Sequence, residues 1–245
     1  MIFHIPCLKL LLFLCVAAFP SAYIYFAKPF IKIRESRLLS ENAATVLIYS
    51  ILLVLALLMG MTDPADFSAE SVMDAGWKNL LFAAAAAMGF VNLAIEYLES
   101  ALSVWIKNQR LPKVRPAALY METFHVSSII SIILAATAEE LIFRQVIIGG
   151  VCEGLGWEAW PAAIVSAVLY GMNHVYFGRF AVIQKCSSGL IYSMFFLSGE
   201  TGIWLCILCH VSQNIILYCW SVRKTMKQKR FEVPSGNRKE LGNDR

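Results

Sequence analysis

Two adjacent glutamates, Glu139 and Glu140, interrupt the apolar stretch 129–150, and Arg144 follows four residues after the second. Residues four apart lie on one face of a helix, so Glu140 and Arg144 can pair. Glu139 is turned away from that face by about 100° and stays outside the pair. A structural ion pair needs one carboxylate and not two, so the extra glutamate indicates chemistry. A buried ion pair with one spare acid facing water is the structural alternative.

Two further apolar stretches each carry a polar face. Tyr170 and His174 are four residues apart, as are His210 and Asn214. Because ionisable groups are costly in lipid, the most favourable arrangement turns these faces toward the glutamates. Taken alone, His174 could mark the end of a span, and His210 with Asn214 could join two helices by hydrogen bonds.

A cluster of this composition suits hydrolysis. A carboxylate in apolar surroundings has a raised pKa, so it can take a proton from water and later deliver it to a leaving amine. A neutral imidazole can orient that water, while a second imidazole and an amide NH₂ can donate to a developing oxyanion. A zinc site is the alternative, because two histidines and one glutamate are a common hydrolytic zinc set. Its ligands would be Glu139, His174 and His210.

The three polar segments resemble the three ordered motifs of the CPBP family of intramembrane proteases, which includes CAAX-processing and bacteriocin-processing enzymes. EELIFR at 139–144 is similar to EExxxR, YGMNH at 170–174 to FxxxH, and HVSQN at 210–214 to HxxxN. The resemblance covers about residues 128–217. Tyr170 stands where the family motif has Phe, and its hydroxyl could donate to His174 or to a substrate.

The resemblance implies a glutamate-type endopeptidase that hydrolyses a peptide bond in a membrane protein or a lipid-anchored peptide, without a cofactor. In the implied mechanism, Glu139 is the base that activates water and His174 assists it. His210 and Asn214 stabilise the oxyanion. It also implies three supporting residues, which are Glu140, Arg144 and Tyr170.

Two other classes of function stay open on the residues alone. One is a non-catalytic immunity or scaffold protein of the membrane that keeps the polar cluster for binding. The other is a small proton-coupled transporter, in which Glu139, Glu140 and His174 relay protons.

The elements that must position these residues are membrane helices. The chain has 245 residues, of which 58% are hydrophobic and only 16% charged, and its mean hydropathy is +0.63. Soluble domains are about one quarter charged, and disordered or secreted disulfide-rich chains are less apolar. Apolar runs of about 20 residues predict an all-α polytopic transmembrane bundle of about seven spans, or eight if the fourth is broken near Thr137. These runs are 5–27, 43–61, 79–106, 117–150, 158–174, 180–197 and 202–222.

The basic residues predict how the spans are oriented. Arg223–Arg245 carries eight bases and three acids, whereas the whole chain is only +4, so the basicity belongs to a tail. No basic stripe runs through a folded domain, which excludes nucleic acid as a partner. Bases also follow the first and third spans and flank the sixth, while acids gather in 62–78. Because bases favour the cytoplasmic side, the N-terminus is expected outside and the C-terminus inside.

The sequence divides into a three-span membrane region at 1–116, a catalytic membrane core at 117–222 and a basic cytoplasmic tail at 223–245. We expect a multi-pass protein of the plasma (inner) membrane, and the oligomeric state stays open. A signal peptide is the alternative interpretation of the first apolar run.

Two other patterns are open to structural interpretations. CILCH at 206–210 fits a haem attachment pattern but lies within an apolar run, so its cysteines are interpreted as packing residues. Glu96 and Glu99 form a polar stripe in the third span. That stripe is expected to line a water path or substrate groove, or to mark the membrane interface.

Overall fold

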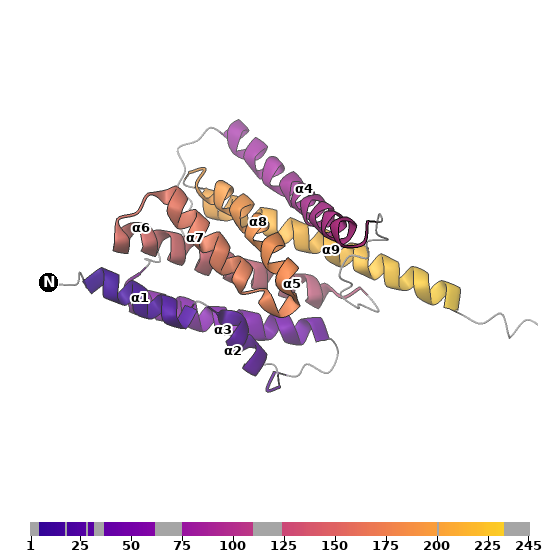
Figure 1. Ribbon diagram of the computed structural model, residues 1–245, viewed down its shortest axis with the longest axis horizontal. Coiled ribbons are helices and arrows are strands. Elements are labelled where there is room, and N and C mark those ends of the chain that lie inside the picture. Colours follow the sequence, from indigo (N-terminus) through magenta and orange to yellow (C-terminus); the bar gives the residue numbers. More distant parts are fainter. Residues whose placement is uncertain are drawn as a thin grey trace, which may run out of the picture.

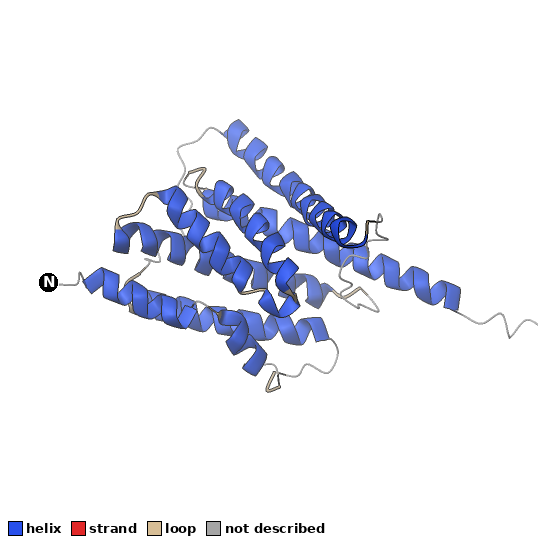
Figure 2. Cartoon of the chain, viewed as in Figure 1, coloured by secondary structure: helices blue, strands red, loops and turns tan. Residues whose placement is uncertain are grey.

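The computed structural model describes residues 5–17, 19–27, 29–31, 37–61, 75–109, 124–199 and 201–232, and these form helices and turns without a strand (Figure 2). The predicted all-α class is therefore confirmed. It follows from the apolar composition, because a backbone in lipid must satisfy its own hydrogen bonds. The loop 62–74, the basic segment 110–115 and the tail beyond 232 lie outside the described residues.

The helices follow one another with short connections where the chain is described. In chain order they are α1 (Ile5–Ala17), α2 (Pro20–Ala27), α3 (Arg37–Leu58), α4 (Ala75–Asn108), α5 (Val126–Glu140), a π-helical segment (Leu141–Ile148), α6 (Gly149–Leu155), α7 (Ala159–Met172), a 3₁₀ turn (Val175–Phe177), α8 (Arg179–Phe196) and α9 (Gly202–Glu232).

Four described helical runs are long and apolar enough to cross a membrane, and a fifth is obtained if the bent pair α1 and α2 counts as one span. The four are Leu38–Leu58, Asn79–Asn108, Val126–Leu155 and Gly202–Met226. The apolar helix α7 is shorter than these. The chain is thus a multi-span membrane protein, while the count of seven stays a prediction.

Two predicted spans differ in detail from the structure. The first, 5–27, is divided into α1 and α2 by a bend of 42° before Pro20, whose missing N–H is tolerated in the first turn of a helix. The fourth is not broken near Thr137: α5, the π-helical segment and α6 form one continuous helical run, and the departure from α-helical geometry begins at Leu141.

The helices from α5 onward occupy the middle of the molecule. In Figure 1, α5 to α9 lie between α4 on one side and α1 and α3 on the other. The core is formed by large, fully buried side chains from both halves of the chain. They include Phe13, Tyr49, Phe143, Tyr170 and Leu205.

Helix α8 runs back along α7 after a tight turn. His174 lies in that turn, and Gly178 connects it to α8 with a backbone φ of 105°, a conformation that glycine adopts without strain. Tyr170 and His174 are therefore held at the end of α7, beside the first turns of α8.

Candidate active site

Glu140 is the centre of a buried hydrogen-bond cluster. Its side chain is 0% exposed. Arg144 Nε donates to Glu140 Oε2 at 2.9 Å, which confirms the pair predicted from their spacing. His210 Nδ1 lies 2.7 Å from Oε1, and the Cys206 thiol donates to Oε2 at 3.0 Å. Both carboxylate oxygens are occupied, so Glu140 orients other side chains.

Arg144 is fully enclosed by the helices around it. Its Nη1 donates to Ser166 Oγ at 3.0 Å, and Ser166 in turn donates to the Phe143 carbonyl oxygen. The guanidinium carbon lies 5.2 Å from the centre of the Tyr170 ring and 5.8 Å from that of Tyr192. An aromatic face attracts a cation, so these two rings replace part of the water that the guanidinium has lost.

Glu139 has a different environment from its neighbour. It is half-buried and borders a cavity of about 280 Å³ that is also lined by His174 and Asn214. These three residues come from α5, the turn after α7, and α9. The cavity therefore brings together three of the four residues that were predicted to be catalytic.

His174 enters this cavity with one ring nitrogen already committed. Its Nδ1 lies 2.8 Å from the carbonyl oxygen of Tyr170. A carbonyl oxygen only accepts, so Nδ1 carries the proton and Nε2 of the neutral ring keeps a free lone pair. Of the two partners considered for the Tyr170 hydroxyl, His174 or a substrate, His174 contacts Tyr170 through the backbone carbonyl instead, with the two rings packed edge to face.

His210 and Asn214 share a helix face but differ in what they contact. Asn214 lines the cavity, whereas His210 is 3% exposed and is not among the lining residues. Its imidazole is held at Nδ1 by Glu140, and the Tyr192 ring stacks on its face at 4.7 Å between centres.

The described residues contain no group of three His, Cys, Asp or Glu side chains placed to hold a metal ion. The alternative zinc set consists of Glu139, His174 and His210. Nδ1 of His210 is already bound to Glu140, which is not a member of that set, so only Nε2 of His210 is left for a metal ion or another partner.

Asn173, which precedes His174, joins the N-terminal helices to the site. Its Nδ2 donates to the Tyr49 hydroxyl at 2.6 Å, and its Oδ1 accepts from the Ser21 backbone N–H at the same distance. Sequence reasoning missed this residue, although an asparagine in an apolar segment beside a candidate histidine is a signal that could have found it. It also missed Ser166, Tyr192 and the hydrogen bond of Cys206, which was interpreted as packing.

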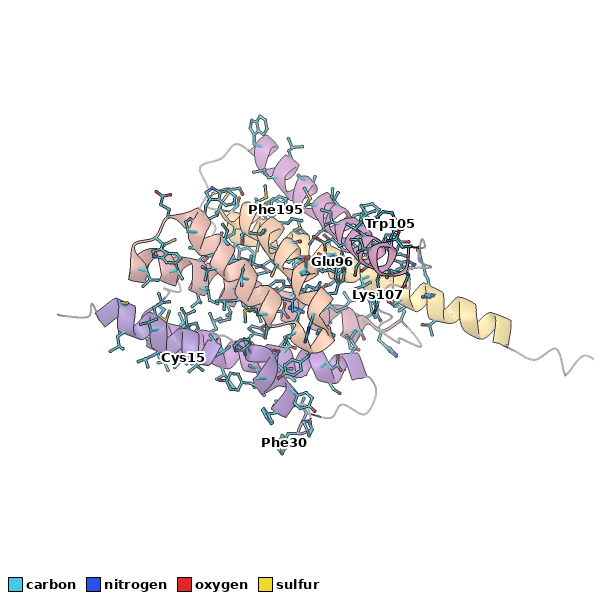
Figure 3. All side chains as sticks on the ribbon, in the orientation of Figure 1. Cys15, Phe30, Glu96, Trp105, Lys107 and Phe195 are labelled. Atoms are coloured by element: carbon cyan, nitrogen blue, oxygen red, sulfur yellow. The ribbon has the colours of Figure 1, made fainter. Side chains whose placement is uncertain are left out.

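The polar stripe of α4 packs against α8. Glu96 accepts from Lys185 Nζ at 2.7 Å and from Ser188 Oγ at 2.6 Å, and Glu99 accepts from Ser187 Oγ at 2.8 Å. Figure 3 shows Glu96 between the two helices. Both glutamates therefore take part in joining α4 to α8.

The comparisons with known proteins agree with the motifs. Residues 122–216 match the family model described as "Type II CAAX prenyl endopeptidase Rce1-like". No curated protein and no solved structure gives a significant match. The matched segment contains all three polar motifs together with the π-helical segment and α7 to α8. Over residues 122–216 the chain is therefore similar to the CPBP family of CAAX-type proteases.

Proposed function

We propose that this protein is an intramembrane endopeptidase in which Glu139 activates a water molecule in the 280 Å³ cavity. One observation carries the proposal: Glu139, His174 and Asn214, from three separate segments, line the same cavity. The family match supports a CAAX-type protease activity. A purely structural cluster needs no cavity beside a carboxylate that lies outside the Glu140–Arg144 pair.

In this mechanism Glu139 takes a proton from water while the water oxygen attacks the carbonyl carbon of the scissile peptide bond. His174 orients the water through Nε2. Negative charge develops on the carbonyl oxygen, where the Asn214 amide donates a hydrogen bond. His210 lies one helical turn before Asn214 and is held at Nδ1 by Glu140, so Nε2 is the ring nitrogen left to donate to the same oxygen. Glu139 then delivers the proton to the leaving nitrogen as the C–N bond breaks.

We propose that no metal takes part. The buried Glu140 carboxylate already has Arg144 and His210 as partners, so it needs no added cation. Cleavage should survive dialysis against a strong zinc chelator, and elemental analysis should find less than one metal ion per chain. Loss of cleavage that added Zn²⁺ restores would instead support the set Glu139, His174 and His210.

The walls of the cavity support a membrane-associated substrate. They combine the polar groups with apolar and aromatic side chains, a lining that suits a mainly apolar peptide. The lining includes Ile24, Tyr25, Phe177 and Leu217. Since the family description names CAAX prenyl endopeptidases, a prenylated peptide ending in a CAAX motif is the first substrate to test.

We also propose seven membrane crossings, with the N-terminus outside, the C-terminus cytoplasmic and residues 117–222 as the catalytic core. His174 follows the C-terminal end of α7. In this topology that end faces the cytoplasm, so substrates would enter the cavity from the cytoplasmic side of the plasma membrane.

The test is hydrolysis of a quenched-fluorescence, prenylated CAAX peptide by the full-length protein in liposomes. We expect two peptide products, and in H₂¹⁸O one ¹⁸O atom should enter the new carboxylate. An uncleaved peptide that still binds would contradict the protease proposal and favour a scaffold role. The same peptide without its prenyl group, measured in parallel, reports whether the lipid is needed.

A further inference from the structure

Two buried amide side chains join α4 to α9, and one of them, Gln213, directly precedes Asn214 on α9. Asn92 is 0% exposed and Gln213 is 1% exposed. Asn92 Nδ2 donates to Gln213 Oε1 at 2.6 Å. Burying amides away from water is unfavourable unless they are hydrogen-bonded, so a pair placed between two membrane helices calls for a specific explanation.

A tyrosine of α8 donates to the same Gln213 oxygen as Asn92 does, and this tyrosine explains the amide pair. The Tyr192 hydroxyl of α8 donates to Gln213 Oε1, next to the bond from Asn92. Its ring, 0% exposed, stacks on the His210 imidazole with the planes 18° apart. Gln213 thus fixes the far end of a ring whose face covers His210.

Glu140 and the Tyr192 ring together restrain the imidazole of His210, and the Tyr170 ring packs edge to face against it at 6.1 Å between centres. Glu140 holds one edge of it through Nδ1, which limits translation in the ring plane but leaves rotation about the hydrogen bond. The stacked Tyr192 ring removes that rotation. Nε2 is then held in one direction, as an oxyanion donor requires, because catalysis depends strongly on the orientation of such a donor.

We propose that Tyr192 is a positioning residue for His210, and that Asn92 and Gln213 act through it. The inference rests on the proposed function, because it assumes that His210 acts in catalysis. Helix α4, which carries no family motif, contributes Asn92. That residue also accepts from Ser188 Oγ at 3.3 Å, which places it in the same set of contacts as Glu96 and Lys185. The N-terminal region would therefore support the catalytic core.

The first experiment measures kcat and KM of Tyr192→Leu on the quenched prenylated peptide. Removing the stacked ring should lower kcat about tenfold or more and leave KM within about twofold, because the restraint matters in the transition state. Tyr192→Phe keeps the ring but loses the hydroxyl bond to Gln213, so it should lower kcat only severalfold, less than the Leu variant does. Equal activity of the Leu variant and wild type would overturn the proposal.

Tyr218 provides a matched control on α9. It is also 0% exposed, and its hydroxyl accepts from the His125 backbone N–H at 2.9 Å, but it does not line the cavity. Tyr218→Leu should lower thermal stability as much as Tyr192→Leu and leave kcat of the folded protein unchanged. If both variants lose kcat in proportion to stability, Tyr192 is only a packing residue.

A double-mutant cycle separates this inference from the proposed function. In a His210→Ala background, Tyr192→Leu should have no further effect on kcat, whereas an independent residue would add its full effect.

A second variant serves if Tyr192→Leu does not fold. Asn92→Leu combined with Gln213→Leu removes the partner of the Tyr192 hydroxyl and leaves the ring in place. This double variant should lower kcat severalfold, and unchanged kcat would refute the proposal. A wild-type protein that does not cleave the peptide would refute the proposed function itself.

Discussion

The neighbouring glutamates Glu139 and Glu140 differ because one residue along a helix is a rotation of about 100°. Glu140 turns into the protein and binds Arg144 and His210, while Glu139 turns toward the cavity. The two carboxylates can therefore have separate tasks. One contacts three neighbouring side chains, and the other borders the cavity.

Glu140 is expected to be essential to stability as well as to activity. Glu140→Gln leaves the buried Arg144 without a balancing charge, which should lower the unfolding free energy by about 3–5 kcal/mol. Thermal unfolding in detergent measures this loss. The double variant Glu140→Leu/Arg144→Met removes both charges and should recover most of the stability but none of the cleavage, since His210 has lost its anchor. A double variant as unstable as the single one would contradict this account.

At the residue scale, short-range relations were predictable and long-range ones were not. Helical spacing sufficed for the Glu140–Arg144 pair and for the contact of His174 with Tyr170. It could not predict that His210 binds Glu140, 70 positions away, because that depends on how α9 packs against α5. For the same reason, Asn214 lines the cavity and His210 does not.

At the element scale, the π-helical segment Leu141–Ile148 begins directly after the two glutamates. A wider turn changes which side chains point inward, and six of its eight residues are buried. Such segments occur often at functional sites. Here it lets Arg144 and Phe143 both reach the protein interior.

Gly89 sets how closely α4 approaches α9. A Cβ at this position would lie 2.6 Å from the Cys209 carbonyl oxygen, whereas one at Gly149 would meet nothing within 4 Å. Gly89→Ala should therefore separate the helices and lower stability by about 1–3 kcal/mol. Gly149→Ala, the control, should be neutral or stabilising by up to about 1 kcal/mol. Equal melting temperatures for the two variants would show that the contact is unimportant.

The apolar runs predicted helices in nearly all the right places, because lipid allows few other structures. The bend between α1 and α2 and the change of geometry at Leu141 were not predicted. Both depend on tertiary packing, on which composition gives no information. The number of crossings is equally hard to predict, since α7 is short and α8 contains polar residues such as Gln184 and Lys185.

At the scale of the whole molecule, the contacts fix the relative directions of the helices. Helix α8 runs opposite to α4, because Ser188 bonds to Asn92 and Gln184 to Ser100. Helix α9 follows α8 in the chain and packs back along it, with Gln213 at Tyr192, so α4 and α9 run in the same direction. These relative directions are the ones expected if successive spans cross the membrane in alternating directions, as the basic residues in the loops predict.

The absolute orientation is testable in sealed vesicles of known sidedness. An epitope tag at the C-terminus should be protected from added protease in right-side-out vesicles, and a tag inserted at 62–74 should be cleaved. Opening the vesicles with detergent, the control, should expose both tags. The reverse pattern would contradict the proposed topology and would move the cavity entrance to the outer side.

Glu139 is proposed as the base that activates water, and the kcat of Glu139→Gln measures this role. The variant keeps the size of the side chain and removes its basicity. We expect kcat on the prenylated peptide to fall about 100-fold or more, with the melting temperature unchanged. Glu153→Gln, which alters an exposed glutamate on α6, should cleave at the wild-type rate. A Glu139→Gln protein that retains wild-type kcat would contradict the account.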